Sequence, residues 1–257
     1  MELELSGKTA VVTGASRGIG LAIVQALLDE GVTVIGGARK APDAKTRLAG
    51  GENFTFVPAD LSSDDGANEF AEAVDVPVDL LVNNVGSAPA RPDGFSSISD
   101  EQWLATIALN LLSAVRVTRR IVPKLRAGAA IVTIASENSM LPDPLVMDYS
   151  AAKAALLSFT KSLSKELAPS GVRVNSVSPG PVATDLWLGS DGVAETTARA
   201  AGTTPSEVRA GAEAAIPTGR FTQPQEVARL VLVLASSTFG NITGADFVID
   251  GGMRPTV

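Results

Sequence analysis

Short apolar runs alternate along the chain with longer stretches in which apolar residues recur at helical spacing. The short runs predict strands at residues 8–12, 32–35, 54–57, 78–82, 130–134, 172–177 and 247–249. The longer stretches predict helices at residues 18–30, 64–73, 100–125, 149–167 and 225–234. Strands and helices that alternate over the whole length predict an α/β fold of Rossmann type, a doubly wound parallel sheet with helices on both faces.

No change in composition and no internal repeat interrupts this pattern, so we expect a single domain over residues 1–257. Its least regular part, residues 184–218, contains two short helical patterns at 193–201 and 205–214. The same part contains Gly189, Gly192, Gly202 and Gly211. A long insertion at the carboxyl end of a strand is usually functional. We therefore predict a lid over the substrate, and a plain surface excursion is the alternative.

The composition narrows the chemistry, because the chain contains no His and no Cys. A Ser-His-Asp triad, a thiol nucleophile and a zinc–thiolate site are excluded, and no metal site is predicted. Acid–base chemistry near neutral pH is left to Tyr, Lys, Asp or Glu. The chain has one tyrosine, Tyr149, which is therefore the first candidate.

The charge and hydropathy of the chain limit the classes of partner that we expect it to bind. A net charge of −7 argues against nucleic acid, which attracts basic surfaces. No apolar run is long enough to span a membrane, so no membrane partner is expected. The first residues do not have the basic start and apolar stretch of a signal peptide. We expect a cytoplasmic protein.

A glycine-rich turn lies between the first predicted strand and the first predicted helix. Gly14 permits a tight turn, Gly18 lets the backbone approach a pyrophosphate, and Gly20 lets the helix pack closely on the strand. The start of the helix presents free N–H groups and a partial positive charge to the phosphates. Glycine-rich turns are common, but this strand–turn–helix setting favours a dinucleotide site.

Other polar or glycine-containing clusters also follow predicted strands. Asp60 follows the third strand, residues 83–86 (Asn-Asn-Val-Gly) the fourth, Ser136 the fifth, and Pro179-Gly180 the sixth. Each alone is consistent with a turn or a helix cap. In a doubly wound sheet, however, ligands bind outside the carboxyl ends of the strands. The clusters together predict one ligand site at that edge.

Tyr149 and Lys153 lie four residues apart near the start of a predicted helix. Residues at this spacing share one helical face, so phenol and ammonium can meet the same ligand. Lys153 would favour the phenolate and lower the pKa of Tyr149. The hydroxyl of Ser136 could polarise a substrate carbonyl beside Tyr149. A surface pair on a helix and a strand-end cap are the alternatives for the isolated motifs.

With these motifs the chain resembles the short-chain dehydrogenase/reductase family over essentially its whole length. The resemblance is carried by residues 13–20, Asp60, residues 83–86, Asn110, Ser136, Tyr149, Lys153, Pro179, Gly180, Thr184 and residues 250–252 (Asp-Gly-Gly). Val85 departs from the pattern, since the family usually has Ala there. The resemblance implies transfer of a hydride between a nicotinamide dinucleotide and a carbonyl/alcohol pair.

The resemblance also implies roles for individual residues. Tyr149 is implied as proton donor and acceptor, and Ser136 as the group that orients the reacting oxygen. Lys153 would bind the nicotinamide ribose and tune Tyr149, and Asn110 would hold a water that connects Lys153 to a proton relay. Asp60 would accept a hydrogen bond from the adenine amine.

Asn83 is expected to stabilise the central strand, Gly86 to lie close to the cofactor, and Thr184 to contact the nicotinamide carboxamide. The full implied cofactor set is Gly14, Ser16, Arg17, Gly18, Ile19, Gly20, Arg39, Asp60, Leu61, Asn83, Gly86, Lys153, Pro179, Gly180, Val182 and Thr184.

The end of the second strand bears on the choice of cofactor. NAD enzymes of this kind carry an acidic residue there for the ribose 2′-hydroxyl, but this chain has Ala38, with no carboxylate before Asp43. Arg39 and Arg17 resemble basic positions of NADP-binding members and could hold a 2′-phosphate. NADP(H) is therefore the expected cofactor, with NAD(H) possible and solvated surface charges as the alternative for Arg39 and Lys40.

The predicted function is an NADPH-dependent ketoreductase. An NAD-dependent alcohol dehydrogenase and a catalytically silent nucleotide-binding regulator are the alternatives. Residues expected near the substrate are Ser87, Met140, Leu141, Leu145, Val182 and Trp187. They are mostly apolar, which suits a bulky apolar ketone, although they could equally be core or lid packing. A homotetramer is expected from the resemblance and from two helices with apolar residues almost all round.

Overall fold

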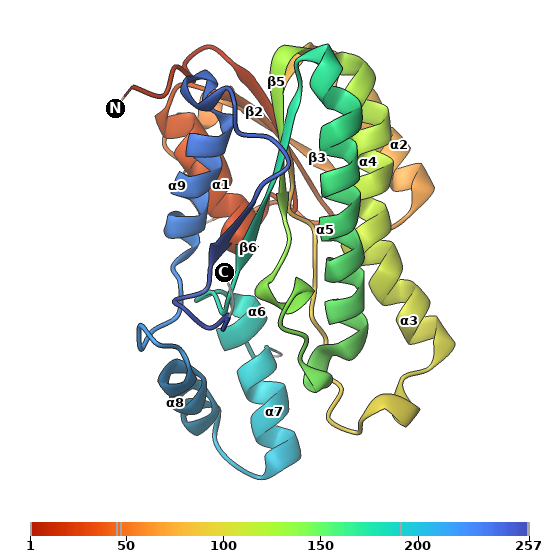
Figure 1. Cartoon of the computed structure of the whole chain (residues 1–257), viewed down its shortest axis with the longest axis vertical. Helices are drawn as coiled ribbons and strands as arrows, with labels where there is room; N and C mark the ends of the chain where they lie inside the picture. Colours follow the sequence, from red (N-terminus) through yellow and green to blue (C-terminus); the bar gives the residue numbers. More distant parts are fainter. Residues whose placement is uncertain (1, 45, 47, 191, 256–257) are drawn as a thin grey trace.

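The computed structural model describes residues 2–44, 46, 48–190 and 192–255. The outermost ends of the predicted domain, and Asp191 within the predicted lid, lie outside this range. The described chain forms one seven-stranded sheet in the order β3-β2-β1-β4-β5-β6-β7 (Figure 1). The strands are β1 Thr9–Thr13, β2 Thr33–Ala38, β3 Phe54–Pro58, β4 Val78–Asn83, β5 Leu125–Ile134, β6 Arg173–Pro179 and β7 Asp246–Ile249.

Every neighbouring pair of strands in this sheet is parallel. The chain builds outward from β1 to β3, then returns to place β4 on the other side of β1. The order reverses between β1 and β4, the position at which ligands bind in folds of this class. The predicted doubly wound parallel sheet is confirmed.

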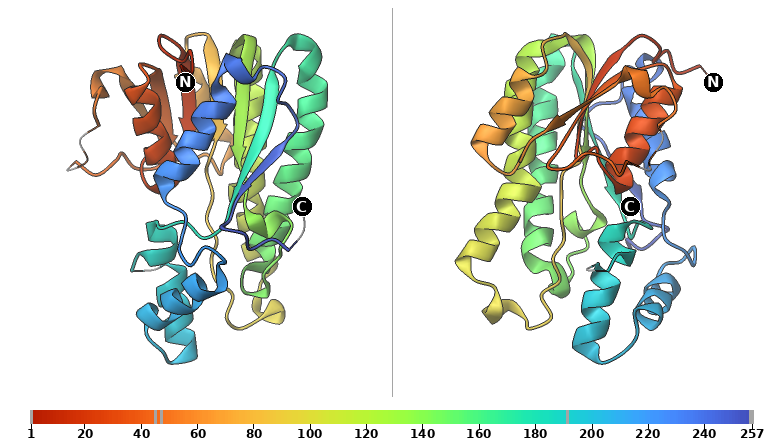
Figure 2. Two further views of the ribbon diagram at one scale, coloured as in Figure 1. Left: turned by 60° about the vertical axis from the view of Figure 1, so that its left-hand side comes forward. Right: turned by 180° about the vertical axis from the view of Figure 1, so that it is seen from behind.

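Helices cover both faces of the sheet (Figures 1 and 2). The helices are α1 Gly18–Asp29, α2 Asp64–Glu72, α3 Asp100–Ile107, α4 Ser113–Ile121, α5 Met147–Leu167, α6 Asp185–Leu188, α7 Val193–Ala201, α8 Pro205–Ala215 and α9 Pro224–Ala235. Alternation along β1 divides the core: Ala10 and Val12 pack with α1 and α9, whereas Val11 packs with α2 and α4.

The predicted helix 100–125 is wrong as a single element. It consists of α3, a π-helical turn Ala108–Leu112, α4 and a 3-10 turn Val122–Lys124, after which β5 begins at Leu125. Pro123 in the last turn ends the helical pattern, because proline cannot donate the backbone hydrogen bond. The strand begins earlier than predicted. Its first residues are exposed and lack an apolar pattern, so the pattern of apolar positions did not reveal them.

The insertion between β6 and α9 folds into α6, α7 and α8, and it lies beyond the carboxyl ends of the strands (Figure 1). Two backbone hydrogen bonds join its two ends: Ala183 N–H to Thr222 O (2.9 Å) and Thr222 N–H to Pro181 O (3.0 Å). Next to them Trp187 packs edge-on against Phe221, with ring centroids 5.1 Å apart. The insertion is therefore attached at its base, while α8 contains no buried residue.

Candidate active site

The glycine-rich turn after β1 has the conformation that the sequence predicts. Gly14 and Gly18 have φ of 65° and 55°, in the left-handed region where a side chain is strained. A Cβ on Gly20 would lie 2.1 Å from Gly14 O, so the helix could not pack so closely with any other residue. Arg17 is exposed and precedes the first helical residue. The start of α1 therefore faces outward at the switch point of the sheet.

Two polar residues that sequence reasoning did not assign hold this turn in place. The Asn84 side chain donates to Thr13 O (3.0 Å) and Gly14 O (3.2 Å), and Thr13 Oγ1 accepts from Asn84 N–H (2.9 Å). The predicted residue Asn83 instead donates to Thr118 Oγ1 (2.9 Å) on α4. Successive side chains along a strand point to opposite faces of the sheet. This alternation could have predicted that Asn83 and Asn84 contact different parts of the protein.

The end of β2 lies next to the end of β3. Arg39 is exposed beside Ala38, and Leu61 is buried. The Asp60 carboxylate accepts from Ser62 N–H (3.1 Å) and Ser62 Oγ (2.7 Å). These hydrogen bonds, with a smaller contribution from the charge of Arg39, lower the pKa of Asp60. The structure therefore places Arg39 and Asp60 together at one end of the strand edge.

Thr184, which lies in the segment after β6, packs against the glycine-rich turn. A Cβ on Gly18 would lie 3.3 Å from Thr184 Cγ2, and Thr184 N–H donates to Val182 O (2.8 Å). Gly180 follows Pro179 at the end of β6 and donates its N–H to Ile249 O (3.0 Å). Residues predicted from two distant parts of the sequence thus meet at the carboxyl edge of the sheet.

Tyr149 and Lys153 occupy the first two turns of α5, and both are buried. The helix begins at Met147, earlier than predicted. Lys153 Nζ donates to Ile134 O (2.8 Å) at the end of β5 and lies 5.7 Å from the centroid of the Tyr149 ring. Ser136 follows β5, with its hydroxyl accepting from Asn138 N–H (3.2 Å). The structure brings Ser136, Tyr149 and Lys153 together as predicted.

The pKa of Tyr149 does not shift in the direction expected from Lys153. Burial raises the pKa of Tyr149 to about 12; hydrogen bonding with Ser136 lowers it, and the nearby Glu137 raises it. Burial also lowers the pKa of Lys153 to about 8. A desolvated phenol and a desolvated ammonium both favour their neutral forms. The raised pKa therefore favours the protonated phenol of Tyr149 over the phenolate.

Asn110 lies in the π-helical turn and is buried. Its side chain accepts from Ser87 N–H (3.0 Å) and donates to Ser87 O (3.0 Å) and Thr106 O (3.0 Å). A Cβ on Gly86 would lie 3.0 Å from Asn110 Oδ1 and 3.4 Å from Lys153 Nζ. Such π turns occur frequently at functional sites. This one brings Asn110, Gly86 and Lys153 together.

A buried ion pair is formed by Asp148, the residue before Tyr149, and the sequence analysis did not predict it. Arg91 Nη2 is 2.6 Å from Asp148 Oδ2, and Thr106 Oγ1 donates to the same oxygen (2.7 Å). Although burial raises the pKa of Asp148, hydrogen bonds from Arg91 and Thr106 bring it below its usual value. Arg91 N–H also donates to Leu145 O (2.7 Å). The signal available in the sequence was Asp148 itself, a charged residue in the otherwise buried segment before Tyr149.

The residues expected near the substrate have mixed positions. Met140 is 61% exposed, whereas Leu141 and Leu145 are half-buried. Ser87 is tied through its backbone to Asn110, and Trp187 packs on Phe221 at the base of the insertion. Glu137, which the sequence analysis did not single out, is buried next to Ser136. The surroundings of the reacting groups are therefore less apolar than expected.

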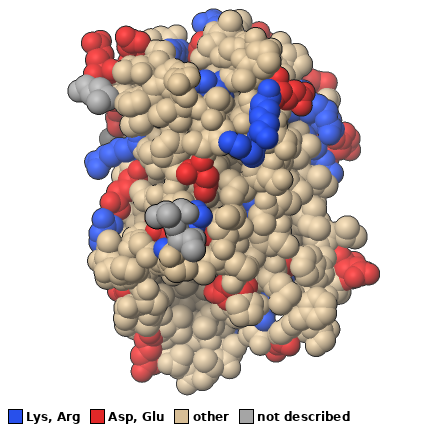
Figure 3. All heavy atoms as spheres, viewed as in Figure 1, with Lys and Arg blue, Asp and Glu red and all other residues tan. Residues whose placement is uncertain are grey.

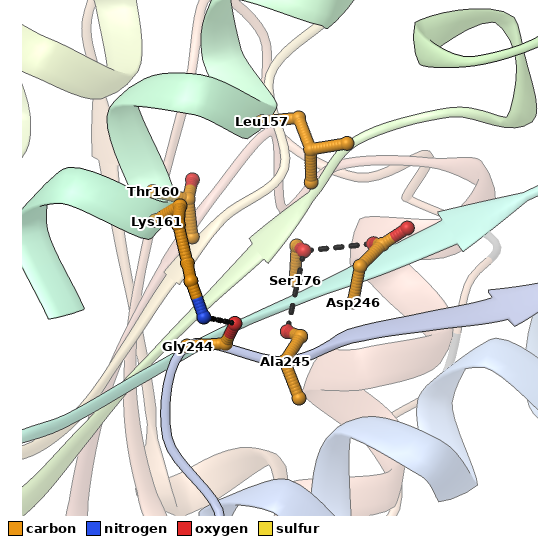
Figure 4. Close-up of a pocket in the computed structure, with 7 residues that line it drawn as sticks. All are labelled: Leu157, Thr160, Lys161, Ser176, Gly244, Ala245 and Asp246. Atoms are coloured by element: carbon orange, nitrogen blue, oxygen red, sulfur yellow. Dashed lines mark hydrogen bonds between the residues drawn. The ribbon is translucent and has the colours of Figure 1, made fainter.

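A cavity of about 150 Å³ lies elsewhere, between α5 and the edge of the sheet (Figure 4). Lys161 Nζ donates to Gly244 O (2.6 Å) at one end of it, and Ser176 Oγ donates to Asp246 Oδ1 (2.7 Å) at the other. Leu157 and Lys161 lie two to three helical turns beyond Tyr149, about 12–18 Å along the axis. None of the predicted site residues lines this cavity.

Two surveys concern only the part of the chain that the structure describes. There, no His, Cys, Asp or Glu side chains form a group of three or more that could hold a metal ion. No described helix is long and apolar enough to cross a membrane. On the face shown in Figure 3, acidic and basic side chains are interspersed, and neither sign gathers in one continuous patch.

A parallel sheet whose switch point carries this glycine turn, beside a buried Ser–Tyr–Lys set, defines a nicotinamide-dinucleotide-dependent oxidoreductase. The family model described as Enoyl-(Acyl carrier protein) reductase matches residues 14–254. A short chain dehydrogenase family protein from Francisella tularensis has a similar structure, with a TM-score of 0.87, 31% identity and coverage of 96% of this chain and 98% of that one. The chain belongs to the short-chain dehydrogenase/reductase family, and it is an NAD(P)-dependent oxidoreductase of carbonyl/alcohol pairs.

Other relatives act on different substrates. The chain is 36% identical over 258 residues to the 3-oxoacyl-(acyl-carrier-protein) reductase FabG of Salmonella typhimurium, covering 98% of this chain and 99% of that protein. It is also similar to the L-sorbose reductase of Gluconobacter frateurii, solved in complex with NADPH and L-sorbose, with a TM-score of 0.90, 30% identity and coverage of 100% of each chain. The family therefore does not specify the substrate.

Proposed function

We propose that the protein is an NADPH-dependent ketoreductase. The observation that carries the cofactor preference is the end of β2, where Ala38 is followed by the exposed Arg39. A carboxylate at this position would repel a 2′-phosphate, and guanidinium groups would bind it with charge-assisted hydrogen bonds. The exposed Arg17 on the glycine-rich turn is the second basic group. The NADPH-bound sorbose reductase supports this choice.

The residues at the carboxyl edge fit a dinucleotide. Gly14, Gly18 and the start of α1 present backbone N–H groups where a pyrophosphate would lie. Thr184, Val182, Pro179 and Gly180 would border the nicotinamide from one side, and Gly86 and Lys153 from the other. Ser16, Ile19 and Gly20 complete the turn, while Asp60 and Leu61 border the adenine. Asn83 supports this edge through Thr118 on α4.

When bound, the reduced cofactor would supply the hydride that the carbonyl carbon accepts. Tyr149 donates its phenolic proton to the carbonyl oxygen, which suits the raised pKa of this residue. Ser136 orients that oxygen with its hydroxyl. Lys153, whose Nζ lies 5.7 Å from the Tyr149 ring centroid, would hold the ribose and stabilise the phenolate that remains. Asn110 would hold the water through which a proton returns to Tyr149.

A kinetic comparison tests this proposal. We expect purified enzyme to reduce members of a panel of ketones, ketoses and 3-oxoacyl thioesters. Catalytic efficiency should be at least about tenfold higher with NADPH than with NADH, and Arg39→Asp should remove most of that preference. Equal use of both cofactors would favour the NAD-dependent alcohol dehydrogenase. NADPH binding seen by fluorescence, without turnover of any substrate, would favour the silent regulator.

The remaining parts of the proposal concern the surroundings of the site. The insertion at residues 184–218 acts as the lid, because it lies beyond the strand ends and is attached at its base. The protein acts in the cytoplasm as a homotetramer. The exposed Ala151, Ala154 and Ala155 on α5 support the assembly, since such a face of small residues packs closely against another helix.

A further inference from the structure

Glu137 is an unusual residue for its position. It directly follows Ser136 and begins the 3-10 turn Glu137–Ser139. Its exposure is 7%. Its Oε2 atom is fully buried and has no hydrogen-bond partner in the described chain. A buried carboxyl group that is neither paired nor hydrogen-bonded is costly, and such groups cluster at functional sites.

The carboxyl group lies between the reacting groups and the end of β6. A Cβ on Gly180 would lie 2.9 Å from Glu137 Oε2 and 2.8 Å from Asp250 Cα. Glu137 therefore occupies space at the end of β6, where the nicotinamide is expected. It is also close enough to Tyr149 to raise the pKa of the phenol. The carboxyl group is thus near both partners of the reaction.

The groups that face Glu137 are acidic. Burial first, and then the charges of Asp250 and Asp143, raise the pKa of Glu137 to about 8. The oxygens of Asp250 accept from Gly252 N–H (2.8 Å) and Arg254 N–H (2.9 Å), and Asp143 Oδ1 accepts from Leu145 N–H (2.8 Å). No cation among the described residues contributes to the pKa of Glu137; Lys153 instead donates to Ile134 O. The described residues therefore offer Glu137 Oε2 no hydrogen-bond partner.

We propose that Glu137 binds a hydroxyl group of the substrate close to the reacting carbonyl, so that the enzyme prefers hydroxyketones. This inference rests on the proposed function as a ketoreductase. A hydroxyl can donate to a carboxylate and accept from a carboxylic acid, so it suits the carboxyl group in either state. An anionic group would be repelled by the charges of Asp143 and Asp250. An ammonium group needs a full negative charge, which burial disfavours.

Pairs of ketones of nearly equal shape test the proposal. Hydroxyacetone is compared with butanone, and 4-hydroxy-2-butanone with 2-pentanone, in the parent enzyme and in Glu137→Met, Glu137→Gln and Asp143→Asn. In the parent we expect kcat/KM for at least one hydroxyketone to exceed that of its partner by about tenfold or more, since sites built for a hydroxyl reject analogues without one. Glu137→Met should bring the ratio to about one by lowering kcat/KM for the hydroxyketone more than for the plain ketone, Glu137→Gln should keep part of the ratio, and Asp143→Asn should keep it.

Several results would overturn the inference while leaving the ketoreductase in place. They are equal efficiency for both members of each pair in the parent, an equal loss on both members in Glu137→Met, or a preference for aminoacetone or pyruvate over hydroxyacetone. A Glu137→Met protein that no longer has the parent's mass in light scattering would instead assign the carboxyl group to subunit contact, and would also overturn it. Failure of the proposed function is distinct, because then no ketone of the wider panel is reduced with either cofactor.

Discussion

At the scale of single residues, the catalytic assignment depends on Tyr149. The chain has no other tyrosine and no histidine that could take its place. We expect Tyr149→Phe to lower kcat by about 10²- to 10⁴-fold, the usual contribution of a general acid. Dissociation constants for NADPH, measured by fluorescence, should stay within roughly threefold of the parent, because the phenol makes little of the cofactor site. Activity of the variant close to that of the parent would remove Tyr149 from the mechanism.

Glu137 leads to a prediction about pH and stability. Its pKa is about 8 in the folded protein and near 4.5 when unfolded, so the unfolded chain loses this proton first as the pH rises. The stability associated with the protonated acid is therefore present below pH 4.5 and lost progressively up to about pH 8. We expect Glu137→Met to melt at a higher temperature than the parent, with a difference that grows between pH 5 and pH 8.

Differential scanning calorimetry over this pH range measures the difference, and Glu137→Gln is the control that stays polar but cannot titrate. Its melting temperature relative to Glu137→Met should not depend on pH in this window. A parent-to-Met difference that is constant with pH would show that the carboxyl group does not titrate there.

At the scale of elements, the pair of Arg91 and Asp148 joins the segment after β4 to the start of α5. Asp148 is fully buried, so Arg91→Met leaves an uncompensated buried charge. We expect a loss of about 3–5 kcal/mol in the free energy of unfolding, measured with urea at fixed protein concentration. The double variant Arg91→Met/Asp148→Asn should recover part of this loss. A double variant less stable than Arg91→Met would contradict that reasoning.

The insertion of α6, α7 and α8 is the element expected to move. No residue of α8 is buried, so little apolar contact holds it to the rest of the protein. We expect fast amide exchange in α7 and α8 of the free protein, and slower exchange when NADPH and a substrate analogue are present, with β5 as a slow internal reference. Exchange as slow as that of β5 in both states would argue that the insertion is a rigid part of the surface.

At the scale of the whole molecule, exposed apolar residues support the proposed assembly of several copies of the chain. Leu104 on α3 is 67% exposed and Val248 on the edge strand β7 is 39% exposed. The exposed residues Ala151, Ala154 and Ala155 of α5 extend the apolar surface to which Leu104 belongs. We expect light scattering to give the mass of a tetramer, and Ala155→Arg to reduce it to a dimer by placing a charge in a close helix contact. Ala210→Arg on the exposed α8 is the control, and a parent of monomeric mass would exclude the tetramer.

The sequence by itself was sufficient for the order and type of most elements and for naming candidate catalytic residues that the fold then places together. Half-buried strands bury every second residue, and helices bury residues three and four positions apart. These periods can therefore be read from the sequence without knowledge of the fold. The glycines at 14, 18 and 20 were recognisable because their backbone geometry is a local property of the turn. Tyr149 was recognisable because the composition left few other groups for acid–base chemistry.

The tertiary structure decided what depends on contacts between distant residues. It separated Asn84, which holds the glycine turn, from Asn83, which contacts α4. It divided one predicted helix at a π turn so that Asn110 could reach Ser87, and it paired Arg91 with Asp148 across 57 positions. Burial reversed the expected pKa shift of Tyr149 and left Glu137 Oε2 without a partner among the described residues. Desolvation and pairing exist only once the chain has closed around these groups, and for that reason local patterns could not reveal them.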